Sequence, residues 1–510
     1  MGMKRLAILF FLAAAVVPAS EPFQKPRLVL AIVIDQFRYD YTTRFQDEYK
    51  GGLGRLLTRG AVFTNARLDH FPSLTAVGHS TFLSGATPSI SGIVGNSWYD
   101  RDSGKPVTSV SDSTVRLVGG GSGTGSSPRR LLVSTLGDEL KIASAGRSRV
   151  FGISFKDRAA ILLAGHSADA AIWFDGVTGH FVTSTYYLSD LPSWVRQFNV
   201  GAADQYRGAE WLGHKLPSDD KAYAELAKTP LANELIESFA ERALEAEKLG
   251  KGPATDLLAV SFSGNDYVGH AYGFESPEAH DISLRTDLLL DRLFRRVDAL
   301  VGMQNVLVVL TADHGIAPTP EAEAARRMPG GRLSFRPFLD AVQEALTKKV
   351  GEGKWVVGIG DESIYLNRAL IDEKNLDRAA VAGIAREAVS ALPHVFRVFT
   401  YDQLIGGKVL PDAVGRMMIN GFNERRAADL IVVLDPYWMF ADSGATHGSP
   451  FGYDTHVPII FMGPGIRAGR YDGPVVMNDI APTLATMLRI ETPSGSVGRV
   501  LSEMFATSKE

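Results

Sequence analysis

The sequence predicts an α/β fold, with a largely parallel central sheet and helices on both of its faces. Short runs rich in Val, Ile and Leu recur along the chain, and each is apolar without alternation, as in strands that are covered on both faces. Patterns of helical period separate these runs, which favours a parallel sheet. The predicted strands are 28–34, 256–262, 306–311, 430–434 and 458–462, and the clearest predicted helices are 231–249, 282–300 and 480–488.

The first residues have the features of a secretory signal. Two basic residues precede an apolar run over residues 6–17, and small residues follow up to Ala19. A membrane anchor is the alternative, but the run is shorter than the roughly 20 residues that a spanning helix needs. We therefore expect a signal peptide over residues 1–19 and one large folded domain over residues 26–510. The mature protein is expected to be periplasmic or secreted, without stable membrane insertion.

Two segments interrupt the alternation of strands and helices, and we expect insertions there, at about residues 170–225 and 332–404. The first contains two β-rich runs around a glycine-containing turn between Ala171 and Tyr187, which predicts an antiparallel hairpin. The second combines short strand patterns with a helical pattern over 377–392. This mixture predicts an α+β subdomain that covers the sheet like a lid.

Composition narrows the possible chemistry. The chain has no Cys, which excludes disulfides, thiolate zinc sites, iron–sulfur clusters and cysteine nucleophiles. Its formal net charge of −4 offers no basic surface for nucleic-acid phosphates, so we expect no nucleic-acid partner. Demanding chemistry must therefore depend on Asp, His, Ser and Thr.

Acidic and imidazole side chains follow three of the predicted strands. Asp35 ends the first strand, and the pair Asp313-His314 follows the third. Asp266 and His270 follow the second strand, and their spacing of four places both on one face of a helical turn. Each of these features alone is equally consistent with a helix cap, a surface pair or a solvated turn. Because ligands gather at the carboxyl ends of parallel strands, their combination predicts a site at that edge.

Four further polar residues are candidates for binding an anion. Thr75 precedes a predicted helix, whose free N–H groups and dipole favour negative charge, although it could equally be an ordinary N-cap. Asn96 lies in a glycine-containing turn, where asparagine is commonly structural. Lys156 and Arg158 would point the same way in an extended segment, and an exposed charged pair is the alternative.

Taken in order, and together with His447 in ATHGSPFGYD, these residues resemble the two-metal hydrolases of the alkaline phosphatase superfamily, in its type I phosphodiesterase and nucleotide pyrophosphatase branch. The segments GHSTFLSGATPSISGIVGNSWYD, SFKDRAA and YDTHVPIIFMG are most similar to the PafA-like, phosphate-irrepressible alkaline phosphatases, which carry a threonine nucleophile. The resemblance covers nearly the whole mature chain. It implies an alkaline phosphatase-like catalytic domain over residues 26–510.

The resemblance also implies a site for two zinc ions. Zinc suits a mixed set of imidazole and carboxylate ligands without thiolates. His456 is the alternative to His447 as the last ligand, and His447 is preferred because its His-Gly pair matches the signature of the family. The implied ligands are Asp266, His270 and His447 for one ion, and Asp35, Asp313, His314 and the Thr75 oxygen for the other.

The implied activity is hydrolysis of small-molecule phosphate monoesters through a phosphothreonine on Thr75. Asn96, Lys156 and Arg158 would contact the transferred phosphoryl group, and the two cationic side chains should favour a dianionic monoester over a diester. Two alternatives stay open: a phosphodiesterase or nucleotide pyrophosphatase with the same metals, and a non-catalytic exported protein that captures metal or phosphate. The sequence sets neither the natural ester nor the oligomeric state.

Overall fold

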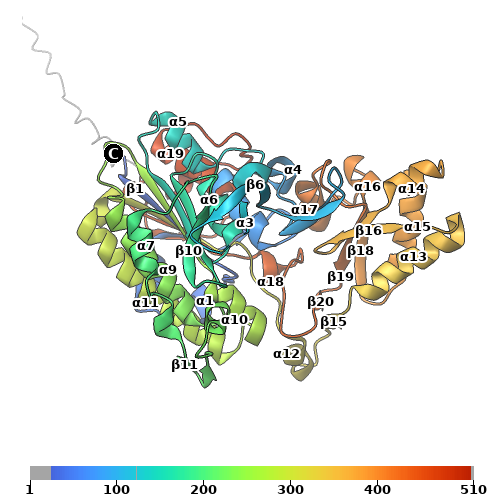
Figure 1. The fold of residues 1–510 in the computed structure, drawn as a ribbon, viewed down its shortest axis with the longest axis horizontal. Helices are drawn as coiled ribbons and strands as arrows, with labels where there is room; N and C mark the ends of the chain where they lie inside the picture. Colours follow the sequence, from blue (N-terminus) through green and yellow to red (C-terminus); the bar gives the residue numbers. More distant parts are fainter. Residues whose placement is uncertain (1–24, 122, 507–510) are drawn as a thin grey trace, which may run out of the picture.

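In the computed structural model, which describes residues 25–121 and 123–506, an 11-stranded sheet forms the centre of the fold (Figure 1). Its five middle strands are parallel to one another, which confirms the predicted fold class. The predicted signal peptide at 1–19 lies outside the described residues. Within the described residues, no helix is both long and apolar enough to cross a membrane.

The order of the strands places the apolar runs of the sequence at the centre. From one edge to the other, the strands are β22 (Gly469–Tyr471), β2 (Ala61–Phe63), β21 (Ile459–Met462), β14 (Val306–Thr311), β1 (Leu28–Ile34), β13 (Asp256–Phe262), β8 (Val150–Ser154), β9 (Ala170–Asp175), β10 (His180–Ser184), β6 (Ser111–Val118) and β7 (Thr124–Ser126).

Helices cover both faces of this sheet (Figure 1). The helices packed with one another on one face are α2 (Gly52–Arg59), α7 (Ser193–Asn199), α9 (Pro230–Ala246), α10 (Gly264–Tyr272) and α11 (Pro277–Leu300). Those on the other face are α3 (Thr75–Ser84), α5 (Leu136–Ala143), α6 (Asp157–Ala164) and α19 (Ile480–Leu488). The predicted helices 231–249, 282–300 and 480–488 are α9, the later part of α11, and α19.

The register of the central strands determines where the site forms. Every residue of β1 is fully buried, as expected for a strand with helices on both sides. Val33 of β1 lies opposite Ser261 of β13 and Thr311 of β14, so these three parallel strands end at nearly the same level. The residues that follow them are therefore brought together at one edge of the sheet.

Two predicted strands pair differently from the expectation. The run at 458–462 is strand β21, which joins the main sheet but is antiparallel to β14. The run at 430–434, expected in the main sheet, is β19 (Leu430–Leu434) and lies in a separate four-stranded sheet. Both are apolar on both faces, so their hydrophobicity did not reveal direction or sheet. The predicted hairpin is the antiparallel pair β9 and β10, which lies within the main sheet.

The separate four-stranded sheet is the core of a small α+β subdomain beside the main body (Figure 1). The first three of its helices pack on the sheet through a hydrophobic cluster of their own, and the last two belong to a second cluster that includes Phe71 of the main body. Its strands are β16 (Val356–Gly360), β17 (Ser363–Leu366), β19 and β18 (Val395–Thr400), and its helices are α13 (Arg336–Val350), α14 (Arg368–Glu373), α15 (Arg378–Ser390), α16 (Tyr401–Ile405) and α17 (Ala413–Gly421).

Short elements complete the fold. The two-stranded pairs are β4 (Ser97–Asp100) with β5 (Lys105–Thr108), β11 (Glu210–Trp211) with β12 (His214–Lys215), β15 (Gly331–Leu333) with β20 (Trp438–Phe440), and β23 (Val475–Val476) with β3 (Ala66–Arg67). The short helices are α1 (Tyr41–Arg44), α4 (Pro88–Ser91), α8 (Lys221–Leu226), α12 (Pro320–Ala325) and α18 (Gly452–Thr455).

One buried histidine in a connecting segment should make the fold sensitive to acid. His70 is fully buried, its ring nitrogens have no hydrogen-bond partner among the described residues, and burial lowers its pKa to about 4. Since this value is below the ordinary 6.5, the unfolded chain takes up the proton first as the pH falls, and folding stability is lost from about pH 6.5 down to pH 4.

Replacing this histidine by an apolar ring should therefore reduce the acid sensitivity. Between pH 7.5 and pH 5, we expect the free energy of unfolding of the parent to fall by about 2 kcal/mol more than that of His70→Phe, from urea denaturation at both values. Equal slopes for the parent and His70→Phe would show that His70 does not titrate in this way.

Candidate metal centre

The carboxyl ends of β1, β13 and β14 bring most of the predicted ligands together. Two groups of buried side chains each have ligand atoms within 4.8 Å of one another. One group is Asp35, Asp313 and His314, and the other is Asp266, His314 and His447. His314 belongs to both because its ring stacks on that of His447, with 3.5 Å between the centroids. The two groups are therefore adjacent parts of one centre.

The third histidine among the predicted ligands, His270, adjoins the second group. It lies in α10 one turn after Asp266, and its Nε2 atom is 3.2 Å from Asp266 Oδ1. Its ring is 5.0 Å from that of His447. The expected division gave His314 to the Asp35 ion alone, whereas in the structure His314 lies within reach of both carboxylate groups. The predicted residues thus converge, with one histidine between the two halves.

The three histidines are oriented like metal ligands. In each, Nδ1 is 2.8–2.9 Å from a backbone carbonyl oxygen, that of Ala445 for His270, Gly315 for His314 and Ser73 for His447. A carbonyl oxygen only accepts hydrogen bonds, so Nδ1 carries the proton and Nε2 is left as the atom with a free lone pair. All three Nε2 atoms face carboxylate oxygens of the centre.

The lone pairs of two neutral histidines face those of carboxylates. Burial lowers the pKa of His314, and burial together with the charge of His314 lowers that of His447 further, so both rings are neutral near pH 7. His314 Nε2 is nevertheless 3.3 Å from Asp313 Oδ2 and 3.7 Å from Asp35 Oδ1. Among the described residues, neither oxygen has a hydrogen-bond partner. Acceptors that face one another in a buried place repel unless a cation lies between them.

The pKa values of the carboxyl groups reflect the charges that are concentrated in this centre. Burial and the nearby charge of Asp313 raise the pKa of Asp35 well above its ordinary value. Asp266 is also buried, but the charges of Lys156 and His270 hold its pKa well below the usual range. Such opposite shifts in adjacent acids are typical of functional sites. The donor set of carboxylates and imidazoles, without thiolates, fits a pair of divalent transition-metal ions.

Thr75 lies at the edge of both groups. It is the first residue of α3 and not its N-cap, and it is 1% exposed. Its Oγ1 atom is 3.5 Å from His314 Nε2 and 3.3 Å from Lys156 Nζ. Lys156 Nζ in turn donates to Asp35 Oδ2 at 2.6 Å and to Asp266 Oδ2 at 2.5 Å. The ammonium group therefore links the hydroxyl to one carboxylate of each group.

Asn96 is fixed beside Thr75 at the start of α3. Its Oδ1 accepts a hydrogen bond from the Ala76 N–H at 2.9 Å. Its own N–H donates to Asp361 Oδ2 at 3.1 Å, in the turn between β16 and β17 of the small subdomain. Asn96 therefore does more than shape a turn, because it connects the first turn of α3 to the subdomain.

Arg158 does not follow the expected geometry. The i, i+2 prediction assumed an extended segment, but only Lys156 is extended, as the residue before α6, and Arg158 lies in the first turn of that helix. Lys156 therefore lies among the carboxylates, whereas Arg158 interacts electrostatically with Asp361, which accepts the Asn96 N–H.

Two residues of the centre were missed by sequence reasoning. The Gln36 backbone N–H donates to Asp313 Oδ1 at 3.0 Å, and its side-chain amide donates to Asp266 Oδ1 at 2.7 Å, so it joins the two groups. His79 lies one turn after Thr75, with Nδ1 3.2 Å from Asp313 Oδ2 and Nε2 2.8 Å from Ser261 Oγ. The spacing of four after Thr75 was a signal that could have identified His79.

The alternative ligand His456 faces away from this centre. Its Nε2 lies 2.9 Å from the Thr64 carbonyl oxygen, and its ring stacks on Tyr39 with 4.3 Å between the centroids. His447 is the residue that lies against Asp266. The structure therefore places His447, and not His456, next to the other candidate ligands.

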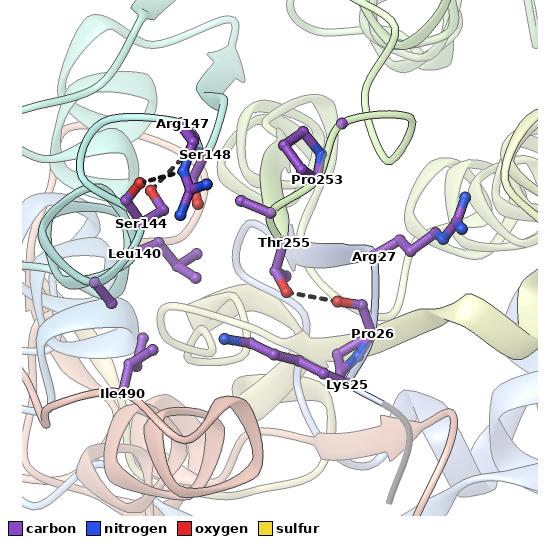
Figure 2. Close-up of a pocket in the computed structure, with 13 residues that line it drawn as sticks. Lys25, Pro26, Arg27, Leu140, Ser144, Arg147, Ser148, Pro253, Thr255 and Ile490 are labelled. Atoms are coloured by element: carbon purple, nitrogen blue, oxygen red, sulfur yellow. Dashed lines mark hydrogen bonds between the residues drawn. The ribbon is translucent and has the colours of Figure 1, made fainter.

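A different hollow, of about 380 Å³, lies at the opposite ends of β1 and β13 (Figure 2). Lys25 and Arg147 line it, and the Thr255 hydroxyl beside it donates to the Pro26 carbonyl. Figure 2 shows the Arg27 side chain directed away from the Lys25 ammonium group. None of the predicted site residues lines this hollow, so it is separate from the metal centre.

Comparison with known proteins identifies a family and several relatives that this chain resembles. The type I phosphodiesterase / nucleotide pyrophosphatase family matches residues 29–456. A protein from Myroides odoratus named calcium-transporting ATPase is 35% identical, over 95% of this chain and 96% of its own. Alkaline phosphatase PhoV from Synechococcus elongatus is 36% identical, over 94% of this chain and 93% of its own. The crystal structure of wild-type alkaline phosphatase PafA has a TM-score of 0.88 and 34% identity, covering 95% of this chain and 99% of that one.

The orientation of the histidines yields a test of metal binding. His447→Ala should weaken Zn²⁺ binding by at least about 100-fold, because it removes an oriented donor. Loss of a group that only orients such a donor already lowers metal affinity by about 10- to 100-fold. Metal content after dialysis against a graded chelator measures this. His456→Ala is the matched control and should retain the parent metal content, because its ring contacts Thr64 and Tyr39. Retention of all metal by His447→Ala would contradict the assignment.

Proposed function

The chain belongs to the type I phosphodiesterase / nucleotide pyrophosphatase family, and we propose that within it this protein is an exported alkaline phosphatase that hydrolyses phosphate monoesters through a phosphothreonine on Thr75. The observation that carries the proposal is the position of the Thr75 hydroxyl, at the start of α3 and against His314 and Lys156. Relatives of nearly equal length named alkaline phosphatases support it.

We propose two zinc ions as the cofactor. Asp35, Asp313 and His314 would hold one beside the Thr75 oxygen, and Asp266, His270 and His447 would hold the other, with His314 close to both. When bound, such a pair supplies positive charge to the attacking and leaving oxygens of an in-line displacement. The unpartnered Asp35 Oδ1 and Asp313 Oδ2 atoms and the free Nε2 lone pairs support this choice.

Lys156 would stabilise the nucleophile rather than deprotonate it. Burial alone would lower the pKa of its ammonium group, but the carboxylates of Asp266 and Asp35 raise it above the ordinary value. A lysine that remains charged cannot accept the Thr75 proton. Its Nζ, 3.3 Å from Thr75 Oγ1, instead favours the negative charge that develops on this oxygen as it attacks phosphorus.

The reaction would proceed in two displacements. In the first, a bond forms between Thr75 Oγ1 and phosphorus, and the bond from phosphorus to the ester oxygen breaks, releasing the alcohol. In the second, water attacks the phosphothreonine, phosphate leaves, and the Thr75 hydroxyl is restored. The N-terminal N–H groups of α3 and the side chains of Asn96 and Arg158 would orient the phosphoryl oxygens.

A phosphodiesterase with the same metals is the second candidate, and burial of the aromatic residues weighs against it. A nucleotide base would need exposed aromatic rings on which to stack. The exposed fractions of Trp98, Trp173 and Phe174 are 2%, 6% and 4%, and these rings pack in hydrophobic clusters of the body, as does the partly buried Tyr99. Without these rings, the extra positive charge of Lys156 and Arg158 favours a dianionic monoester.

Export is also proposed, from the signal-like residues 1–19 alone. A periplasmic or secreted location would give the enzyme access to phosphate esters outside the cytoplasm. Small-molecule esters are the proposed substrates.

Removal of the cationic side chains of Lys156 and Arg158 should lower the hydrolysis of monoesters more than that of diesters. We expect Lys156→Ala combined with Arg158→Ala to lower kcat/KM for p-nitrophenyl phosphate by about 10³-fold or more, and to lower that for bis-p-nitrophenyl phosphate much less. Because Lys156 also contacts Asp35 and Asp266, metal content is measured in parallel, and Arg158→Ala alone serves as the variant that leaves these contacts intact. Equal losses on both esters would contradict the charge argument.

Removal of the nucleophile distinguishes catalysis from simple capture of metal or phosphate. Thr75→Ala, loaded with zinc, should lose at least about 10³-fold in turnover of p-nitrophenyl phosphate while retaining its fold and its metal. Thr81→Ala, on the same helix and equally buried, is the control and should retain turnover. Turnover that is unchanged in Thr75→Ala, or absent from the zinc-loaded parent, would favour a non-catalytic protein.

A further inference from the structure

A second cluster of cationic side chains lies outside the metal centre, around a surface hollow of about 550 Å³. None of the predicted catalytic or metal-binding residues lines it. Segments that are distant in the sequence form it: the start of β6, the short turn at Pro128–Arg130, and the chain that leads into β19. The lining residues are Ser111, Asp112, Ser113, Thr114, Arg129, Arg130 and Arg426.

The charges around this hollow are unbalanced. Asp112 is the one acid among the lining residues, and its carboxylate is already engaged by Arg129 at 2.7 Å, by the Ser127 hydroxyl and by Thr114. In the part of the chain that the structure describes, neither Arg130 nor Arg426 has a carboxylate within 4.0 Å. Three arginines against one aspartate among the lining residues leave an excess of positive charge at the hollow, which Asp100 offsets in part at Arg426.

The two unpaired guanidinium groups are held close together by the fold. Arg426 Nη1 donates to the Arg130 carbonyl at 2.6 Å and to the Gly92 carbonyl. The two guanidinium carbons lie 5.1 Å (Arg426) and 5.9 Å (Arg130) from the centroid of the Trp98 ring. Burial, and to a smaller extent the charge of Arg130, lowers the pKa of Arg426 to about 10, against the opposing charge of Asp100.

Arg130 retains its full capacity to donate hydrogen bonds. Its Nε atom is buried and has no hydrogen-bond partner among the described residues, and its side chain donates to none of them. A guanidinium group presents its donors in a planar fork that matches two oxygens of a phosphate or sulfate. An anion in the hollow would accept hydrogen bonds from this side chain and would offset the repulsion between the two arginines.

We propose that this hollow is a binding site for a tetrahedral dianion, inorganic phosphate, held by Arg130 and Arg426. A tetrahedral dianion offers oxygens to both guanidinium groups, whereas a single carboxylate carries one negative charge and two oxygens. The site uses none of the metal ligands and does not include Thr75. It therefore stands independently of the proposed phosphatase activity.

Equilibrium dialysis of the zinc-loaded protein against radiolabelled inorganic phosphate tests the proposal. The parent should bind two phosphates per chain, and Arg130→Gln should bind one, or should bind the second at least about tenfold more weakly. This substitution breaks no hydrogen bond of the Arg130 side chain to the described residues. Arg425→Gln, at the exposed neighbour of Arg426, is the matched control and should bind two.

Competition and kinetics separate this site from the metal centre. Sulfate should displace the second phosphate, because the arginines recognise tetrahedral dianions by charge and shape. Arg130→Gln should leave inhibition of turnover by phosphate unchanged, because that inhibition reports the metal centre. An Arg130→Gln variant that binds as many phosphates as the parent, with the affinities of the parent, would overturn the proposal. Loss of turnover with retention of the second phosphate would count against the proposed function alone.

Discussion

The structure depends on one buried arrangement at an edge of the central sheet, in which lone pairs of neutral histidines face lone pairs of carboxylates. Neutral His314 directs its Nε2 towards oxygens of Asp313 and Asp35, and neutral His447 directs its Nε2 towards Asp266. Backbone carbonyls hold the rings in these orientations by taking the protons of Nδ1. An arrangement of this kind is costly in a buried place and becomes favourable when cations lie between the donors. The folded chain therefore has a site in which bound metal ions would balance the facing lone pairs and the negative charge.

Much of this centre could be predicted from the sequence because parallel strands end at one edge. Asp35 and Asp313 immediately follow apolar runs, and Asp266 and His270 have the spacing of one helical turn, so local patterns were sufficient to bring them together. The large helices were predicted for the same reason, since their periodicity is local. The family resemblance added His447 and Thr75, which no local pattern would have joined to the others.

The remaining features depend on tertiary contacts that a local pattern does not record. The run at 430–434 is as apolar as a central strand, yet it pairs in the small subdomain, because hydrophobicity reports burial and not the partner strand. The stacking of His314 on His447 places one ring between both carboxylate groups. Likewise, α6 begins at Asp157, so Lys156 is extended and Arg158 is helical. The prediction that both side chains point the same way assumed an extended segment.

The small subdomain contacts the segment that leads to Thr75 and is not merely an appended cover. Asp361 accepts the Asn96 N–H, and Asn96 in turn accepts the N–H of Ala76, next to Thr75. Gly95 permits this approach, since a Cβ there would lie 2.3 Å from Asp361 Oδ2. The start of α3 is thus fixed from the metal side by Lys156 and from the subdomain side by Asn96. The geometry around Thr75 therefore depends on how the two parts of the protein pack.

The central claim is that two cations lie in this cage, with the Thr75 oxygen beside them. Anomalous scattering from crystals of the zinc-loaded protein, recorded on both sides of the zinc absorption edge, tests it most directly. The account predicts two strong peaks about 4 Å apart, one next to Asp35 and Asp313 and the other next to Asp266 and His447, with Thr75 Oγ1 in contact with the first. A single peak, or peaks remote from these side chains, would contradict it.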